Sequence, residues 1–139
     1  MKPLTKLLPI VFLLMINCVA QKTTVTYDEV VYEAITRGRF KNITVVNSEV
    51  KYKSSDEEKK TVISSEEVKQ LNDAVSKLKL EEIKNLKAPT NKRMYDGSMH
   101  AVVKIKIGED QYVSSTFDDG HPPKELQELV NVLMDFIEK

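Results

Sequence analysis

The clearest alternation of apolar and polar positions lies between residues 99 and 139. In the run 100–107, apolar side chains occupy every second position, and a valine and two lysines stand between them. This period of two predicts a strand that buries one face. A turn at Gly108 and a second short run over 111–117 predict a hairpin. After the break at 117–123, apolar residues recur at the spacing of a closing helix, namely Leu126, Leu129, Val130, Leu133 and Ile137.

The first half of the chain predicts several strands. Segments that mix β-branched, aromatic and charged residues predict strands over 27–35, 40–46 and 49–53. Residues 54–60 are polar, and we expect them to form a solvent-exposed loop. The run 59–63 could add only a brief edge strand.

A capping box marks the start of the first predicted helix. Ser64 and Glu67 stand three residues apart, so each side chain can bond the other's backbone N–H group. Residues 80–86 predict a further short helical turn, and Pro89 disfavours helix immediately before it. The first helix carries a narrow apolar stripe made of Val68, Leu71, Val75 and Leu78.

Together these elements predict an α+β domain. We expect an antiparallel β-sheet of about four to five strands with two main helices packed on one face, in the order ββα-ββα. Each amphipathic helix must bury one stripe, and each half-polar strand pair offers one apolar face. The other face carries Lys104 and Lys106 and can stay in contact with water.

The first twenty residues differ in composition from the rest and predict an export signal. Lys2 and Lys6 give a basic start, and residues 7–16 form an apolar run. This run is shorter than the ~20 residues that a membrane span needs. We therefore expect a signal peptide over 1–20 and a single α+β domain over 21–139, in the periplasm or secreted.

Cys18 is the single cysteine of the chain, and it leaves two alternatives open. In the first, cleavage after Ala20 gives a mature chain without a thiol. In the second, Cys18 is the acylated first residue of a bacterial lipoprotein, although Asn17 and Met15 fit that signal poorly. Neither alternative allows a disulfide within the mature chain, so its stability must come from the core.

The charge balance bears on the expected partners. Removal of Lys2 and Lys6 would leave 19 basic and 21 acidic residues, a formal net charge near −2. This is no electrostatic footprint for nucleic acid. No later apolar run approaches the length of a membrane span, so we expect no transmembrane segment in the mature chain. An unidentified envelope protein or ligand is therefore the expected partner.

Four short motifs give the chain a resemblance to a group of known proteins. They are Ala20-Gln21, Thr36-Arg-Gly38, Tyr95-Asp-Gly97 and the stretch from Phe117 to Pro123. With these motifs the chain resembles small secreted proteins of unknown function from Bacteroidota. The resemblance implies export and an α+β domain, and it brings no activity and no functional residue.

One candidate metal site lies at the base of the predicted hairpin. Asp96 and His100 stand before its first strand, and Asp118, Asp119 and His121 follow its second. Because a hairpin brings its two ends together, these side chains could converge on Zn²⁺, Mn²⁺ or Ca²⁺. The alternative is turn chemistry, in which an aspartate favours the N-terminus of the following helix.

Arg37 and Arg39 flank Gly38 and form a second candidate site. Two guanidinium groups beside a flexible backbone could clamp a carboxylate, a phosphate or a partner. The alternative is a charged turn in which Arg37 pairs with an acid nearby: Asp28, Glu29 or Glu33.

The chain shows no motif of a known catalytic class. The spacings of a nucleophile elbow, a zinc protease and an EF-hand are missing, as is a glycine-rich phosphate loop. We therefore expect no cofactor, and a non-enzymatic binding module of the cell envelope is the leading hypothesis. A small metal-dependent hydrolase using the five residues at the hairpin base and a lipoprotein acylated at Cys18 are the alternatives. Five tyrosines spread over the chain are read as sheet-packing residues: Tyr27, Tyr32, Tyr52, Tyr95 and Tyr112.

Overall fold

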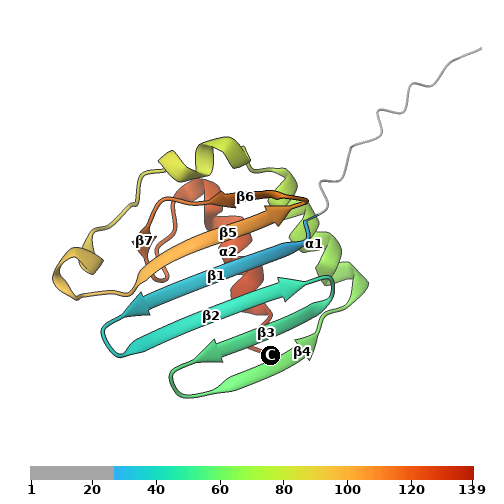
Figure 1. Ribbon diagram of the computed structural model, residues 1–139, viewed down its shortest axis with the longest axis horizontal. Coiled ribbons are helices and arrows are strands. Elements are labelled where there is room, and N and C mark those ends of the chain that lie inside the picture. Colours follow the sequence, from blue (N-terminus) through green and yellow to red (C-terminus); the bar gives the residue numbers. More distant parts are fainter. Residues whose placement is uncertain (1–26) are drawn as a thin grey trace, which may run out of the picture.

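The computed structural model describes residues 27–139, so the predicted signal peptide and Cys18 lie outside the described part. Four consecutive antiparallel strands open it, as Figure 1 shows. They are β1 (Glu29–Thr36), β2 (Arg39–Val46), β3 (Glu49–Ser54) and β4 (Glu58–Val62). The burial of β1 alternates with the period of two seen in the sequence.

The second half of the chain adds its strands to the other side of β1. Strand β5 (His100–Ile107) pairs antiparallel with β1, and β6 (Asp110–Val113) follows it by a hairpin. The strand order is therefore β4-β3-β2-β1-β5-β6, with the short β7 (Phe117–Asp118) paired to the start of β5. This order leaves β4 at one edge of the sheet.

Two α-helices cover one face of the sheet. Helices α1 (Ser65–Ser76) and α2 (Gln127–Asp135) lie on the same side of it in Figure 1. Within residues 27–139, no helix is long and apolar enough to cross a membrane. Three short 3-10 helices complete the layer and the connections: η1 (Leu80–Asn85), η2 (Lys92–Tyr95) and η3 (Lys124–Leu126).

The predicted capping box at the start of α1 is confirmed. The Ser64 hydroxyl accepts a bond from the Glu67 backbone N–H, and the Glu67 carboxylate accepts one from the Ser64 N–H at 2.8 Å. The carboxylate also bonds the Lys139 ammonium, which ties the end of the chain to α1. The Lys139 bond and then the bonds from Ser64 lower the pKa of Glu67 to about 2.

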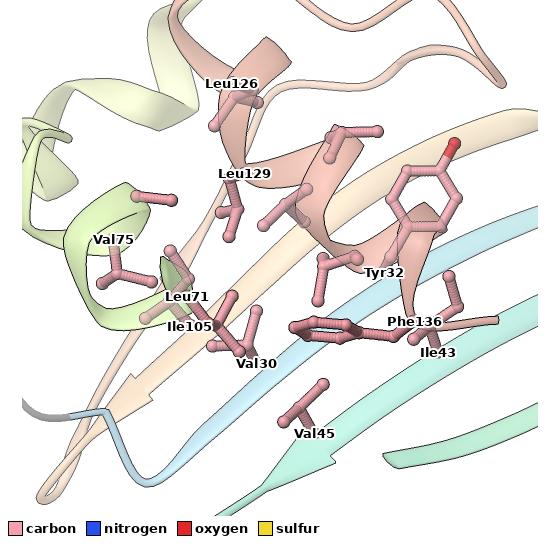
Figure 2. Close-up of a cluster of buried hydrophobic side chains, with 14 of the residues drawn as sticks. Val30, Tyr32, Ile43, Val45, Leu71, Val75, Ile105, Leu126, Leu129 and Phe136 are labelled. Atoms are coloured by element: carbon pink, nitrogen blue, oxygen red, sulfur yellow. The ribbon is translucent and has the colours of Figure 1, made fainter. Parts of the chain in front are cut away.

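The core lies between this helix layer and the sheet. Figure 2 shows Leu71 and Val75 of α1 and Leu129 of α2 directed at side chains of the strands. Transfer of these apolar groups out of water is the main favourable term in folding. The strand side chains that the figure labels are Val30, Tyr32, Ile43, Val45 and Ile105, all fully buried.

The α+β class and the antiparallel sheet are confirmed, but the expected strand count is too low. The sheet has seven strands where four to five were expected, and four of them precede α1, so the order ββα-ββα does not describe the chain. Strand β4 is exposed at all five positions and so carries no apolar alternation. A tight turn, closed by a 2.8 Å bond from the Ser54 N–H to the Glu57 carbonyl, replaces most of the polar loop expected over 54–60.

Candidate functional site

The structure brings together the two ends of the closing hairpin. His100 at the start of β5 is the register partner of Asp118 in β7. The Asp119 N–H donates a 3.0 Å bond to the Met99 carbonyl. Four of the five candidate metal ligands belong to this region, but their side chains point in different directions.

The Asp118 carboxylate is fully buried and bonded to the connector before β5. It accepts bonds from the Thr90 hydroxyl at 2.5 Å, the Lys92 N–H at 2.7 Å and the Arg93 N–H at 3.0 Å. The Arg93 guanidinium adds an ion pair at 3.0 Å. Burial acts to raise the pKa of Asp118, but the bonds from Thr90 and Arg93 outweigh it and hold this pKa well below its usual range. Asp118 therefore stabilises the connector before β5 and the start of η2 by hydrogen bonds and an ion pair.

The next carboxylate, Asp119, joins a second set of partners. Its carboxylate accepts a 2.5 Å hydrogen bond from the Tyr32 hydroxyl and forms an ion pair with the Lys41 ammonium at 2.8 Å. The Lys41 ammonium also lies 5.6 Å from the centroid of the Tyr32 ring. Burial, and then the bond to Asp119 and its charge, raise the pKa of the Tyr32 phenol, which stays a donor at neutral pH. This cluster fastens the loop after β7 to the centre of the sheet.

The other three candidate ligands lie at the surface. Asp96 ends η2 in a left-handed conformation, with φ 61°, and is exposed. His100 and His121 are exposed as well, and the His121 Nδ1 lies 3.4 Å from the Asp119 carbonyl. In residues 27–139, no three His, Cys, Asp or Glu side chains gather so that they could hold a metal ion. The metal-hydrolase hypothesis stays a prediction for metal addition to test.

Arg37 and Arg39 lie at the tip of the β1–β2 hairpin. Gly38 between them has φ +76°, which favours glycine, and both arginines are exposed. Of the acids expected near Arg37, Glu33 instead pairs with Lys104 at 2.9 Å. Among the described residues no ion pair joins either arginine to an acid, so both guanidinium groups are accessible to an anion or a partner.

The sheet face opposite the helices carries a shallow depression that sequence reasoning did not single out. Ile35 and Phe40 are direct register partners on this open face, 53% and 38% exposed. They line a depression of about 410 Å³ together with polar residues of β2, β3 and β4. Because no α-helix covers this side in Figure 1, the two side chains meet solvent.

Charged side chains of both signs also line this depression. Lys51, Lys53 and Glu58 line the depression on the β3–β4 side. Glu33 lines it on the β1 side, where its carboxylate is held by Lys104. The depression therefore combines an exposed apolar pair with polar and charged groups, as many protein interfaces do.

The sequence contained a weak signal for this site. In the alternating run of β1, the positions that face away from the core are Glu29, Val31, Glu33 and Ile35, so two apolar residues fall on the polar face. The expectation that the tyrosines pack in the sheet is met by Tyr32, Tyr52 and Tyr112, while Tyr27 is buried just before β1 and Tyr95 of η2 is exposed. The aromatic residue of the open face is thus a phenylalanine, Phe40.

Comparison with known proteins adds no assignment. No family model matches this chain, and no curated protein matches it.

Proposed function

We propose that this protein is an exported, non-enzymatic binding module that contacts a partner protein of the cell envelope through the open face of its sheet. The observation that carries the proposal is the exposed pair Ile35 and Phe40, which lines a depression of about 410 Å³. A side chain of the partner would enter this depression. The surrounding lysines and glutamates would orient the partner.

Physical chemistry favours binding at this face. Burial of exposed apolar area on binding is favourable by about 25 cal/mol per Å². Aromatic anchors such as Phe40 carry much of the binding energy at protein interfaces. The open face is also formed by strands, so a partner would meet a surface that needs little reordering on binding.

The location in the envelope rests on the sequence of the first twenty residues. A basic start, an apolar run and small residues before Gln21 support cleavage and export to the periplasm or beyond. Acylation of Cys18 is the alternative route to the same compartment. An intact mass of the protein recovered from cells tests this step, because a chain that starts at Gln21 and a diacylated chain that starts at Cys18 differ in mass.

A site-specific photo-crosslink tests the binding face. A photoreactive phenylalanine analogue replaces Phe40 in one sample and Gln127, an exposed residue of α2, in a matched control. After irradiation of intact cells, the proposal expects a discrete protein adduct from position 40 and none from position 127. Equal adduct yields at both positions, or an adduct at position 127 alone, would contradict it.

A further inference from the structure

The two edges of the sheet differ in how they are protected. At the β6 edge, the segment that follows β6 is hydrogen-bonded to the η1 region. The Ser115 N–H donates a 3.0 Å bond to the Ile83 carbonyl, and the Ser115 hydroxyl donates one to the Leu86 carbonyl. At the other edge, β4 pairs only with β3 among the described residues. All five of its residues are exposed, and Figure 1 shows this strand along one border of the sheet. An exposed edge strand is a template for pairing with another strand, and because β4 is short and carries three charged side chains, a strand that pairs with it must match those charges.

The hydrogen-bond ladder shows which backbone groups of β4 point away from β3. Bonds from the Ser54 N–H to the Glu57 carbonyl, at 2.8 Å, and from the Ile63 N–H to the Ser48 carbonyl, at 2.9 Å, mark bonded pairs at the two ends. Bonded and non-bonded pairs alternate along an antiparallel ladder. The residues that direct their N–H and C=O groups outward are therefore Glu58, Lys60 and Val62.

We propose that β4 pairs antiparallel with β4 of a second copy of this chain, so that Glu58 lies opposite Lys60 of the partner subunit and the two-fold axis passes beside Lys59. A two-fold axis normal to the sheet allows only pairings in which outward-facing residues oppose one another. With the axis at Glu58 or at Lys60, like charges would face each other, and with the axis at Thr61, Lys60 would face a valine. Among pairings confined to residues 58–62, the Lys59 register is the one that sets opposite charges side by side, and it does so twice.

Backbone and side chains support the same register. Each of the two Glu58–Lys60 pairs would exchange two backbone hydrogen bonds, and opposite charges directly across an antiparallel pair are stabilising. In this register the two Lys59 side chains also stand opposite each other at the axis, on the helix-covered face, because the register partner of Lys59 is Tyr52, which packs against the core. Lys59 already bonds the Glu57 carboxylate at 3.1 Å, which offsets part of its charge.

The pairing would also join the open faces of the two copies. A two-fold axis normal to the sheet keeps both helix layers on one side and both open faces on the other. The depression that contains Glu58 lies next to this edge. The dimer inference does not depend on the proposed partner protein, so an experiment can contradict either proposal without contradicting the other.

Charge-exchange variants test the register. Sedimentation velocity of the purified protein, with its N-terminus read by intact mass, should show a reversible dimer as the concentration rises. Glu58→Lys places lysines opposite lysines, and Lys60→Glu places glutamates opposite glutamates. Each variant alone should weaken the dimer by about tenfold or more, because two attractive pairs become repulsive. An equimolar mixture of the two variants should restore a dimer, as should the double variant E58K/K60E.

Both variants alter exposed residues, so the fold is expected to persist, and circular dichroism checks it. Hydrogen exchange gives a second readout: the amides of Glu58 and Lys60 should exchange more slowly as the concentration rises. A wild-type chain that stays monomeric at about 1 mM, a weak limit for a small interface, would overturn the proposal. So would a dimer that neither single variant weakens, or one that the mixture fails to restore.

Discussion

The hydroxyl of Tyr32 donates a 2.5 Å hydrogen bond to the carboxylate of Asp119 and so joins the central strand of the sheet to the loop after β7. The adjacent Asp118 bonds the connector on the other side. Two consecutive aspartates therefore fasten two different segments. Both carboxylates of this acidic stretch therefore act as acceptors for protein donors.

Replacement of Tyr32 by phenylalanine should destabilise the fold modestly. The substitution keeps the buried ring and removes one bond to a charged acceptor, so we expect a loss of about 1 to 2 kcal/mol in the free energy of unfolding. Urea denaturation measures it. The double variant with Lys41→Met tests the coupling, because both side chains contact the same carboxylate. Strict additivity would show that the three residues do not act together.

Replacement of Asp118 by alanine should cost more. It leaves the Arg93 guanidinium and the Lys92 and Arg93 N–H groups without their acceptor, and loss of one member of a buried charge pair costs about 3 to 5 kcal/mol. Asp96→Ala, at an exposed position of the same region, is the matched control and should change stability by less than about 0.5 kcal/mol. Equal effects of the two substitutions would contradict the structural role of Asp118.

Stability should fall in acid, because Asp118 and Glu67 both have a lowered pKa in the folded protein. A lowered folded-state pKa adds stability that is present above the unfolded value, about 4, and is lost as the pH falls toward the folded value. We expect a free energy of unfolding that is flat from about pH 7 to 5 and declines below about pH 4. Asp118→Asn should show a smaller decline than the wild type, and an identical pH profile would contradict the assignment.

Addition of Zn²⁺, Mn²⁺ or Ca²⁺ should leave the thermal unfolding midpoint unchanged, because Asp118 and Asp119 are occupied by protein donors. A metal present at 100 times its Kd would add about 2.7 kcal/mol, which in a domain of this size raises Tm by roughly 10 °C or more. Differential scanning calorimetry with and without a chelator makes the comparison. A metal-dependent rise of several degrees would revive the metal-hydrolase hypothesis.

The sequence predicted those elements whose patterns have a local cause. The alternation of 100–107 predicted β5, and Ser64 with Glu67 predicted the start of α1. Strand β4 was underestimated because its side chains are all exposed, and an edge strand needs no apolar face when its partner β3 supplies the ladder. Its pairing is a tertiary property that no local pattern records.

For the candidate site too, contacts within the hairpin could be predicted from the sequence, whereas contacts with distant segments could not. That the ends of the hairpin would meet could be predicted, and His100 and Asp118 are register partners. Which way each carboxylate would turn could not, because the partners of Asp118 and Asp119 come from segments far away in the sequence, Thr90–Arg93 and Tyr32. The depression around Phe40 also depends on four strands that only the folded sheet aligns.

The affinity of a crosslinked partner for two alanine variants is the most direct test of the open face as a binding surface. Phe40→Ala removes the aromatic side chain that lines the depression, whereas Met94→Ala removes an apolar side chain that is 73% exposed on η2, outside this face. The account predicts that Phe40→Ala raises the Kd by about tenfold or more and that Met94→Ala leaves it unchanged. An unchanged Kd for Phe40→Ala, with the fold intact, would contradict it.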